Sequence, residues 1–349
     1  MATIREIANL AGVSPTTVSN VIHGNFSKVS GKKKELIQKL ITELDYTPNV
    51  GAMMLAGKTT KIIGVITNYS KKYSSAVLED PFVAGILDAI EGEIRSRGYY
   101  TMLHVAQCNE EVVSLAETWR VSGLLIMGLE PVDCAEILAK SRVPIVFIDC
   151  YFNKHYDIGS KKVLPLYHNI GLEDKKGGYV MTKYLISIGH KKIIFVADKD
   201  INDTVNILRY KGYLQALEEA GLPVPDCKKI LLYRDKTKRD RALNDLCEYW
   251  RLEHFSALFF CSDYYAFQAM RFFIEKGIKV PQDISIAGYD DNLFAKHAYP
   301  SLTTVHQDIK GRGVAAVKML DSIIKGKKIE TKTEVFPVRL VKRGSTISL

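Results

Sequence analysis

A short stretch near the N-terminus carries small polar side chains at positions where they can contact the bases of nucleic acid. Ser14 is a typical helix N-cap, and Pro15 suits the first helical position because its missing N–H costs nothing there. Small polar residues then occupy the faces that the apolar Val18 leaves free, namely Thr16, Thr17, Ser19 and Asn20. On a short helix, such residues can enter a major groove and reach base edges. The alternative is a solvated pair of helices within a larger domain.

The preceding residues predict the helix that must support this one. Thr3 and Glu6 have the spacing of a capping box, which fixes a helix start, and Gly12 suits the tight turn that follows. Apolar residues recur at helical spacing and should bury one face over residues 3–11: Ile4, Ile7, Ala8 and Ala11. The pattern therefore predicts two short helices around a turn.

A third helix should follow, with Ser30 as its cap. Its apolar residues predict a buried stripe: Leu36, Ile37, Leu40, Ile41 and Leu44. Lys32, Lys33 and Lys34 fall in the first turn, where cations oppose the helix dipole. A nearby phosphate backbone would explain these lysines, and an ordinary solvated run of charge is the alternative.

Residues 49–56 after Pro48 allow about two helical turns, which is marginal for a helix in water. Gly51 weakens it further. Met53, Met54 and Leu55 are consecutive apolar residues without an evident core. One of them could wedge between base pairs in a minor groove. The alternative is a linker that packs against the rest of the chain.

The remainder of the 349-residue chain alternates apolar strands with helical patterns. The predicted strands are Ile62–Thr67, Thr101–Val105, Gly123–Met127, Ile145–Ile148, Ile193–Val196, Ala257–Phe260 and Ile284–Ala287. Predicted helices include Gly85–Arg97 and Thr204–Ala220. This alternation predicts an α/β body with parallel sheets, and such sheets bind ligands at the carboxyl ends of their strands.

Polar residues at those strand ends are the candidates for ligand binding. Asp149 ends one strand, Ser262 and Asp263 follow another, and Asp290 with Asp291 follows a third. Arg209 lies on a predicted helix. Carboxylates accept and arginine donates paired hydrogen bonds, which suits sugar hydroxyls. For each acid the alternative is a helix cap or a salt bridge between lobes.

Composition narrows the function classes. The net charge is +9, and residues 1–61 hold eight Lys or Arg against four Asp or Glu, which mildly favours a polyanionic partner. Six scattered cysteines without a CxxC pair, no signal-peptide pattern and no long apolar run predict a cytoplasmic protein without a membrane anchor. No metal-ligand or catalytic motif stands out, so we expect no cofactor, no metal and no catalytic residue. A solute-binding protein and an enzyme on a doubly wound fold remain the rival interpretations.

Several motifs together resemble the lac repressor/gal repressor family of bacterial transcription regulators. They are TIREIANLAGVSPTTVSNVI from Thr3, the LAGKTT hinge from Leu55, IGVI from Ile63, DPF from Asp80, SIGHKKIIFVA from Ser187 and PQDISIAGYDDN from Pro281. The likeness spans essentially the whole chain. It implies an all-α helix-turn-helix domain joined to a two-lobed, periplasmic-binding-protein-like body.

The resemblance also implies roles for single residues. It implies that bases are contacted by Pro15, Thr16 and Asn20, and phosphates by Ser14, Thr17, Ser19 and His23. Leu55 is implied to be the minor-groove wedge, with Met54 beside it. The positions implied to contact an effector are Phe82, Asp149, Arg209, Ser262, Asp290 and Gln307.

The implied protein is a homodimeric repressor that binds a pseudo-palindromic operator and a small effector, a sugar or sugar derivative. The C-terminal residues carry no leucine heptad, so a tetramer is not expected. Asn20 stands where the family often has Arg, which predicts a different half-site. The expected limits are a helix-turn-helix domain over 1–47, a hinge over 48–60 and a body over 61–349. The first lobe is expected over 61–161 and 293–322, and the second over 162–292 and 323–349.

Overall fold

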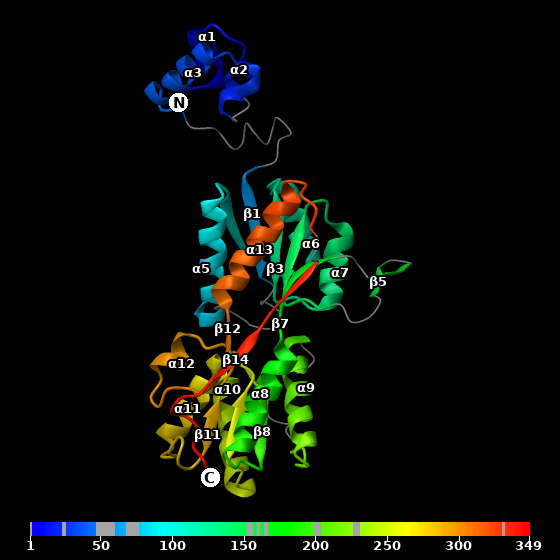
Figure 1. Ribbon diagram of the computed structural model, residues 1–349, viewed down its shortest axis with the longest axis vertical. Helices are drawn as coiled ribbons and strands as arrows, with labels where there is room; N and C mark the ends of the chain where they lie inside the picture. Colours follow the sequence, from blue (N-terminus) through cyan, green and yellow to red (C-terminus); the bar gives the residue numbers. More distant parts are fainter. Residues whose placement is uncertain are drawn as a thin grey trace. The chain divides into compact units, whose positions relative to one another are not determined.

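The computed structural model divides into two compact units, Met1–Thr60 and Lys61–Leu349, which we describe separately (Figure 1). The structure describes residues 2–22, 26–46, 60–67, 77–151, 156–158, 161–163, 167–198, 204–225, 231–329 and 332–349. Of the expected hinge over 48–60, only Thr60 falls within these ranges.

The first unit is helical, with α1 (Ile4–Ala11), α2 (Pro15–Ile22), the short 3-10 helix η1 (Phe26–Lys28) and α3 (Gly31–Glu43). The predicted capping box is present, because the Thr3 hydroxyl accepts from the Glu6 amide at 3.2 Å and the Glu6 carboxylate accepts from the Thr3 amide at 2.9 Å. Gly12 ends α1 in the left-handed region with φ +61, which only glycine adopts without strain. Local capping therefore fixes the turn between α1 and α2.

One small apolar core holds the three helices together. It is built from Ile7, Ala8, Val18, Val21 and Ile37, all buried. The stripe expected on α3 is only partly correct. Leu36 is 42% exposed and Leu44 36%, because the short helices α1 and α2 cover only the face around Ile37. Ser30 precedes α3 as expected, but its side chain makes no capping hydrogen bond.

The first lobe of the body is built on a six-stranded parallel sheet. Its strand order is β13-β7-β4-β3-β1-β2. The strands are β1 (Ile62–Thr67), β2 (Tyr100–Val105), β3 (Gly123–Met127), β4 (Ile145–Ile148), β7 (His168–Leu172) and β13 (Thr333–Phe336). The covering helices are α5 (Pro81–Ser96), α6 (Asn109–Thr118), α7 (Pro131–Lys140) and α13 (Ile309–Ile324), and η2 (Val77–Glu79) precedes α5.

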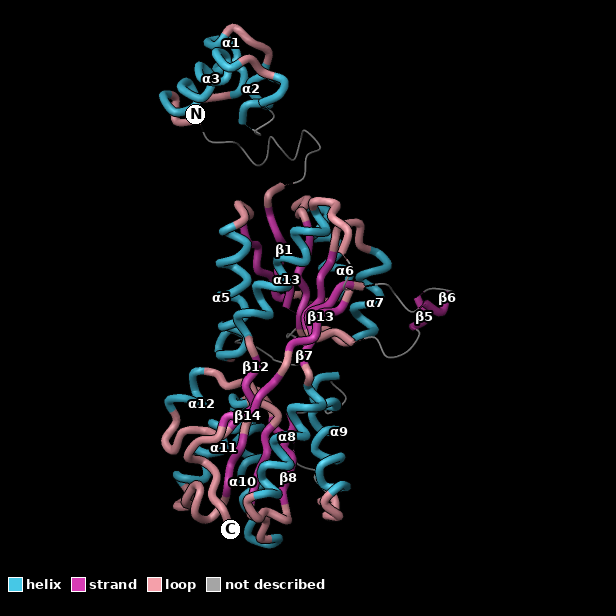
Figure 2. The backbone as a smooth tube through the Cα atoms, in the orientation of Figure 1, coloured by secondary structure: helices cyan, strands magenta, loops and turns pink. Residues whose placement is uncertain are grey.

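Helices cover both faces of the first sheet (Figure 2), and successive residues of its central strands pack against opposite layers of helices. In β3, Leu125 and Met127 pack with α5 and α13, while Leu124 and Ile126 pack with α6 and α7. This two-sided burial explains why the strand is a continuous apolar run. Helix α5 begins four residues before the predicted Gly85, because Asp80 caps it and Pro81 occupies its first position.

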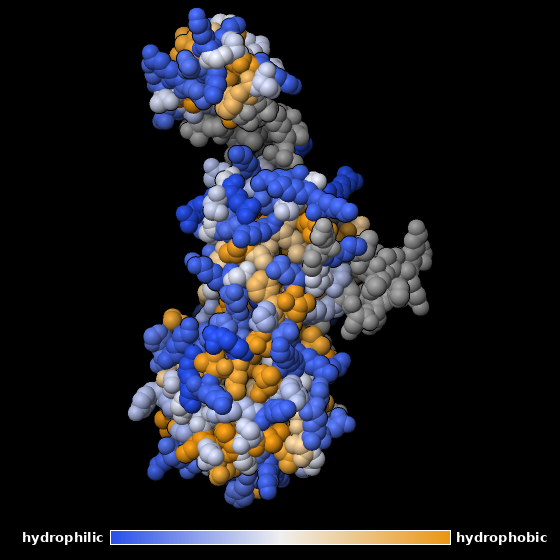
Figure 3. All heavy atoms as spheres, viewed as in Figure 1, coloured by the Kyte–Doolittle hydropathy of each residue, from blue (hydrophilic) through white to orange (hydrophobic). Residues whose placement is uncertain are grey.

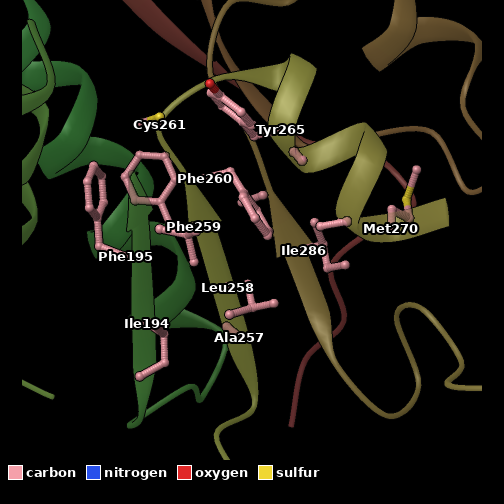
Figure 4. Packing of buried hydrophobic residues seen from close by; sticks show 14 of the residues in the cluster. Ile194, Phe195, Ala257, Leu258, Phe259, Phe260, Cys261, Tyr265, Met270 and Ile286 are labelled. Atoms are coloured by element: carbon pink, nitrogen blue, oxygen red, sulfur yellow. The ribbon is translucent and has the colours of Figure 1, made fainter. Parts of the chain in front are cut away.

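The second lobe has a four-stranded parallel sheet with the order β11-β10-β8-β9. Its strands are β8 (Ile193–Asp198), β9 (Leu231–Leu232), β10 (Ala257–Phe260) and β11 (Ser285–Ala287). Its helices are α8 (Asp174–Ser187), α9 (Thr204–Glu219), α10 (Lys236–Glu253), α11 (Asp263–Glu275) and α12 (Leu293–His297). Figure 4 shows the aromatic part of its core. There the rings of Phe195 and Phe259 pack edge to face, with 5.3 Å between the ring centres.

The chain passes between the lobes at three places. These places differ from the lobe boundaries that the sequence predicts, which lie after residues 161, 292 and 322. Strands β7 and β13 belong to the first sheet, although the sequence analysis assigned them to the second lobe. Helix α12 was expected in the first lobe, but it packs on α11 of the second, with Ala295 in that lobe's core. Long-range strand pairing decides these points, and the pattern along one strand does not encode its neighbours.

Two antiparallel strands, β12 (Thr304–Gln307) and β14 (Val338–Val341), run through this crossover region (Figure 2). A separate hairpin of β5 (Tyr156–Ile158) and β6 (Lys161–Val163) projects from the first lobe. Among the described residues, no helix combines the length and apolar content needed to span a bilayer.

Candidate functional site

The N-terminal end of α2 presents the residues expected to contact DNA. Ser14, Pro15 and Thr16 are exposed. The Ser14 hydroxyl accepts from the Thr17 amide at 3.2 Å, as an N-cap should, and it also lies 3.0 Å from the Thr17 hydroxyl. Capping thus anchors the start of α2 while Pro15 and Thr16 stay accessible.

The remaining candidates of this helix are less exposed. Thr17, Ser19 and Asn20 are half-buried, on the sides of α2 that flank the buried Val18 and Val21. Their positions suit the edges of a contact surface. His23, Met54 and Leu55 lie outside the described residues.

Two of the three lysines at the start of α3 are exposed to solvent. Lys32 and Lys33 are exposed, whereas the Lys34 ammonium lies 4.0 Å from the centre of the Phe26 ring. No acidic residue occupies the first turn of α3. Lys32 and Lys33 can therefore bind an anion without first breaking an intramolecular ion pair of that turn.

A cavity of about 110 Å³ lies between the two lobes of the body, and all six residues expected to contact an effector line it. They are Phe82, Asp149, Arg209, Ser262, Asp290 and Gln307. Phe82 comes from the start of α5, Asp149 follows β4, and the others come from the second lobe and the crossover strand β12. The structure thus brings together residues from six separate segments of the chain.

Arg209 is held in place by close packing of α8 on α9. A Cβ atom on Gly178 would lie 1.9 Å from the Arg209 carbonyl oxygen, so only glycine permits this approach. Arg209 Nε donates to Asp174 Oδ1 at 2.8 Å, and Nη1 donates to the Cys261 carbonyl at 2.6 Å. Its guanidinium lies 3.7 Å from the centre of the Tyr289 ring. These contacts fix the direction of the buried cation.

Asp149 is bound from the same lobe by the fully buried Arg312, whose Nη2 donates to its Oδ1. Arg312 Nη1 also donates to Gln307 Oε1 at 2.5 Å, and Gln307 Nε2 donates to Asp290 Oδ1 at 2.6 Å. Gln307 therefore links an acid of the first lobe to one of the second. The backbone φ is +60 at Asp149 and +128 at Asp290, a strained conformation that occurs often at functional sites.

Burial and like charge raise several carboxyl pKa values around the cavity. Burial raises the pKa of Asp174 to about 6, against the attraction of Arg209. It raises the pKa of Asp263 to about 7, although hydrogen bonds from Thr304 and the Asn292 amide oppose the shift. The pKa of Asp290 is also raised, first by burial and then by the charge of Asp263. Burial therefore favours the protonated form of these carboxyl groups relative to an ordinary aspartate.

Asp263 and Asp291 do not line the cavity. Asp263 Oδ1 accepts from the Thr304 hydroxyl at 2.6 Å, and Asp291 accepts from His306 Nδ1 at 2.8 Å and from Arg343 Nη2 at 2.5 Å. These two acids instead tie the second lobe to the crossover segments.

Sequence reasoning missed several residues that line the cavity: Asp80, Asp198, Asn206, Arg234 and Tyr265. The sequence did contain a signal for Asp80, because this residue precedes a proline at a helix start. It also contained one for Asp198, which lies at the end of β8 much as Asp149 follows β4. The sequence contained no such signal for Arg234, because this residue lies in a loop. Within the described residues, the buried hydroxyl oxygens of Ser262 and Tyr265 have no hydrogen-bond partner.

In comparisons with known proteins, each of the two compact units matches a family model. Residues 3–49 match the family model described as bacterial regulatory proteins, lacI family, and residues 182–346 match that of a periplasmic binding protein-like domain. The chain is 35% identical to the HTH-type transcriptional repressor PurR of Pasteurella multocida, covering 99% of this chain and 98% of the relative. It is 34% identical to the repressor of the same name from Haemophilus influenzae (strain PittEE), and the match covers 92% of this chain and 90% of that relative.

Solved structures share the fold over most or nearly all of the chain. The lac repressor dimer bound to operator and the anti-inducer ONPF superposes with a TM-score of 0.79 at 26% identity, covering 99% of both chains. The complex of the transcriptional regulator CelR with cellobiose superposes with a TM-score of 0.70 at 26% identity. The match covers 99% of this chain and 100% of the CelR chain. A regulator from Enterococcus faecium with bound ribose superposes with a TM-score of 0.68 at 25% identity. The match covers 82% of this chain and 99% of that regulator's chain.

Proposed function

The chain belongs to the lacI family of bacterial regulatory proteins, and on that premise we propose how its residues perform the family's work. It is a DNA-binding transcriptional repressor rather than an enzyme, and a small molecule bound in its body controls its affinity for operator DNA. A protein that must reach the bacterial chromosome works in the cytoplasm.

In this proposal α2 is the recognition helix, and Pro15, Thr16 and Asn20 contact base edges. Ser14, Thr17, Ser19 and His23 contact phosphates, as do Lys32 and Lys33. The exposure of Pro15, Thr16, Lys32 and Lys33 supports these assignments. Asn pairs well with adenine, and Pro15 offers apolar contact to a thymine methyl, which favours a half-site with A·T pairs at these positions. Leu55, with Met54 beside it, is the proposed wedge in the minor groove.

The effector is proposed to be a sugar or a sugar derivative. A monosaccharide ring needs several hydrogen-bonding groups and an apolar surface, and the cavity offers both. Asp149 and Asp290 can accept from hydroxyls, and the hydroxyls of Ser262 and Tyr265 lack partners within the described residues. Phe82 supplies the apolar face. The structural neighbours with cellobiose and with ribose bind ligands of this class.

A homodimer with a pseudo-palindromic operator is the proposed assembly, since the lac repressor neighbour is a dimer on operator DNA. The surface in Figure 3 mixes hydrophilic and hydrophobic residues. Strand β2 forms an edge of the first sheet, and there Tyr100 is 69% exposed and Leu103 42%. Apolar side chains on an open sheet edge favour association with another surface.

Control by the effector requires a difference in binding energy between two arrangements of the lobes. Residues of both lobes line the cavity, so a ligand there contacts both and favours the arrangement that fits it. The hinge over 48–60 joins the body to the DNA-binding unit, so a change in lobe geometry reaches the DNA through it.

The single observation that carries the effector proposal is the convergence of six expected residues on one cavity. A thermal-shift screen over sugars, sugar phosphates, nucleobases and nucleosides tests it. A binding compound present at 100 times its Kd should stabilise the fold by about 2.7 kcal/mol. If only compounds without sugar character stabilise the protein, the carbohydrate proposal is wrong. Fluorescence anisotropy with random DNA at two salt concentrations tests DNA binding independently.

A further inference from the structure

An ion pair joins the two lobes at the edge of the cavity. Arg234 Nη2 donates to Asp80 Oδ2, across 154 positions of sequence. Asp80 caps α5 of the first lobe, and Arg234 lies between β9 and α10 of the second. Both residues line the cavity. The bond therefore connects the two walls of the site that the effector must enter.

Both partners are held in position by their own lobes. Asp80 Oδ1 accepts from the Phe82 amide at 3.0 Å, so the carboxylate is fixed by its capping role and presents Oδ2 to Arg234. The Arg234 guanidinium lies 4.0 Å from the centre of the Tyr264 ring and 5.3 Å from that of Tyr265. Stacking on aromatic rings orients an arginine before it binds.

Burial makes the loss of one partner of this pair more costly than in an ordinary surface salt bridge. The exposed fraction of the side chain is 7% for Asp80 and 14% for Arg234. Solvent screening is weak at such sites, and a charge that loses its partner there is costly. By contrast, the pair of Lys192 and Glu253 in the second lobe is 40% and 44% exposed, and such pairs contribute little.

The other two arginine pairs beside the cavity act within one lobe. Arg312 binds Asp149 in the first lobe, and Arg209 binds Asp174 in the second. Neither of these ion pairs spans the two lobes by itself, although Gln307 connects Arg312 to Asp290 of the second lobe through neutral amide hydrogen bonds. The pair of Asp80 and Arg234 does restrain the distance between the lobes, because separating the lobes must break it.

We infer that Asp80 and Arg234 form a latch that holds the two lobes closed. Lobe opening therefore depends on breaking this ion pair. A ligand that separates the partners must supply a donor to Asp80 and an acceptor to Arg234. A hydroxylated compound satisfies both, whereas a purely anionic group would leave Asp80 beside a like charge. This last consequence rests on the proposed function of the cavity, but the latch itself does not.

The test measures the distance between the lobes in the full-length protein without DNA and without any ligand. Spin labels are attached through an unnatural amino acid at Arg142 in the first lobe and Arg271 in the second, whose side chains are 87% and 69% exposed. Labelled protein is diluted with unlabelled protein so that distances between subunits do not contribute. Double electron–electron resonance then gives the distribution of distances.

Asp80→Asn keeps a residue that can cap α5 but removes the charge, and Arg234→Gln removes the other charge. Each single variant should raise the ratio of open to closed molecules by on the order of tenfold, since a charge-assisted hydrogen bond contributes enough for that. The double variant should open no further than the more open single variant, because both substitutions remove the same bond between the lobes. Lys192→Gln, which breaks the exposed pair within the second lobe, should leave the distribution unchanged.

Identical distributions for the wild type and both single variants would overturn the latch, provided that circular dichroism shows all proteins folded. Equal opening in Lys192→Gln would also overturn it, because the effect would then be a general response to lost charge. Operator binding is measured separately by anisotropy. A protein that opens as expected but binds no operator would contradict the proposed function and leave the latch intact.

Discussion

At the scale of single residues, arginines around the cavity neutralise aspartates that would otherwise be buried alone. Arg209 shows this best, since it is bonded to Asp174, to a backbone carbonyl and to the face of Tyr289. It therefore has a structural role as well as a proposed role in binding. Its substitution should affect both stability and effector response.

Arg209→Ala should abolish the effect of the effector on operator binding. It should also lower the free energy of unfolding by about 3–5 kcal/mol, because Asp174 is left buried without its partner. Titration of operator binding with and without the effector, together with denaturant unfolding, measures both. The unliganded variant should still bind operator, since the DNA-binding unit has a core of its own. A normal response to the effector would show that Arg209 is not part of the binding site.

Asn20→Arg should change the preferred base at one position of each half-site from adenine towards guanine. The reason is geometric, since the carboxamide matches the N6 and N7 atoms of adenine, whereas arginine matches O6 and N7 of guanine. Selection from a pool of randomised operators measures the preference. Wild type and variant with the same consensus would show that Asn20 contacts no base.

At the scale of elements, helix starts carry much of the proposed chemistry. Helix α2 presents Pro15 and Thr16, two of the residues proposed to contact bases, in its first turn. Helix α3 presents lysines in its first turn, and Asp80 combines the cap of α5 with the bond to Arg234. Helix α11 begins at Asp263, which ties it to Thr304 of the crossover strand β12. At α5 and α11, residues at the start of the helix thus also join it to another segment.

Lys32→Ala combined with Lys33→Ala should weaken binding to specific and random DNA alike. Each lost phosphate contact should reduce the slope of log affinity against log salt by about 1. Lys39→Ala on the same helix is the matched control, because Lys39 is 71% exposed but lies near Glu43 at the far end. A loss confined to one DNA sequence, or an equal loss in the control, would contradict the phosphate role.

The raised pKa of Asp263 makes stability depend on pH. The folded pKa is about 7, while an unfolded aspartate titrates near 4, so the folded protein binds a proton that the unfolded chain has released between these values. The contribution of this group to the free energy of unfolding is therefore present at about pH 4 and is lost as the pH rises through about 7.

Asp263→Asn should remove that contribution. The free energy of unfolding at pH 5 minus that at pH 8 should be smaller in the variant than in the wild type, as denaturant melts at both pH values would show. Some dependence should remain, because the pKa values of Asp174 and Asp290 are also raised. An unchanged difference would mean that Asp263 is ionised in the folded protein across this range.

At the scale of the whole molecule, regulation requires that events in the body reach the DNA. The two compact units meet in sequence at Thr60 and Lys61, directly after the hinge. In the proposed mechanism the hinge inserts Leu55 into the minor groove only when the body holds two hinges near each other. The effector then acts by changing the lobe arrangement of a dimer.

Leu55→Ala should weaken binding to the operator by a few kcal/mol, since the wedge is lost. Binding to random DNA and the melting temperature of the body should not change. Gel-shift titrations with operator and with random DNA measure the first two quantities, and calorimetry the third. Unchanged operator affinity would remove the wedge from the mechanism.

Local physics allowed much of the fold to be predicted from the sequence. The capping box of Thr3 and Glu6, the left-handed Gly12 and the cap at Ser14 involve contacts within a few residues. Strands buried on both faces are continuous apolar runs, so β1, β3, β4 and β10 lie at their predicted positions. The family's motifs then pointed to six cavity residues.

Only the tertiary structure decided what depends on distant pairing. The placement of β7 and β13 in the first sheet, the exposure of Leu36 on α3 and the ion pair of Asp80 with Arg234 all rest on contacts between remote segments. A periodic pattern states which face of an element is apolar but not what covers it. A loop arginine carries no periodicity at all, so Arg234 became part of the site only when folding placed it against Asp80.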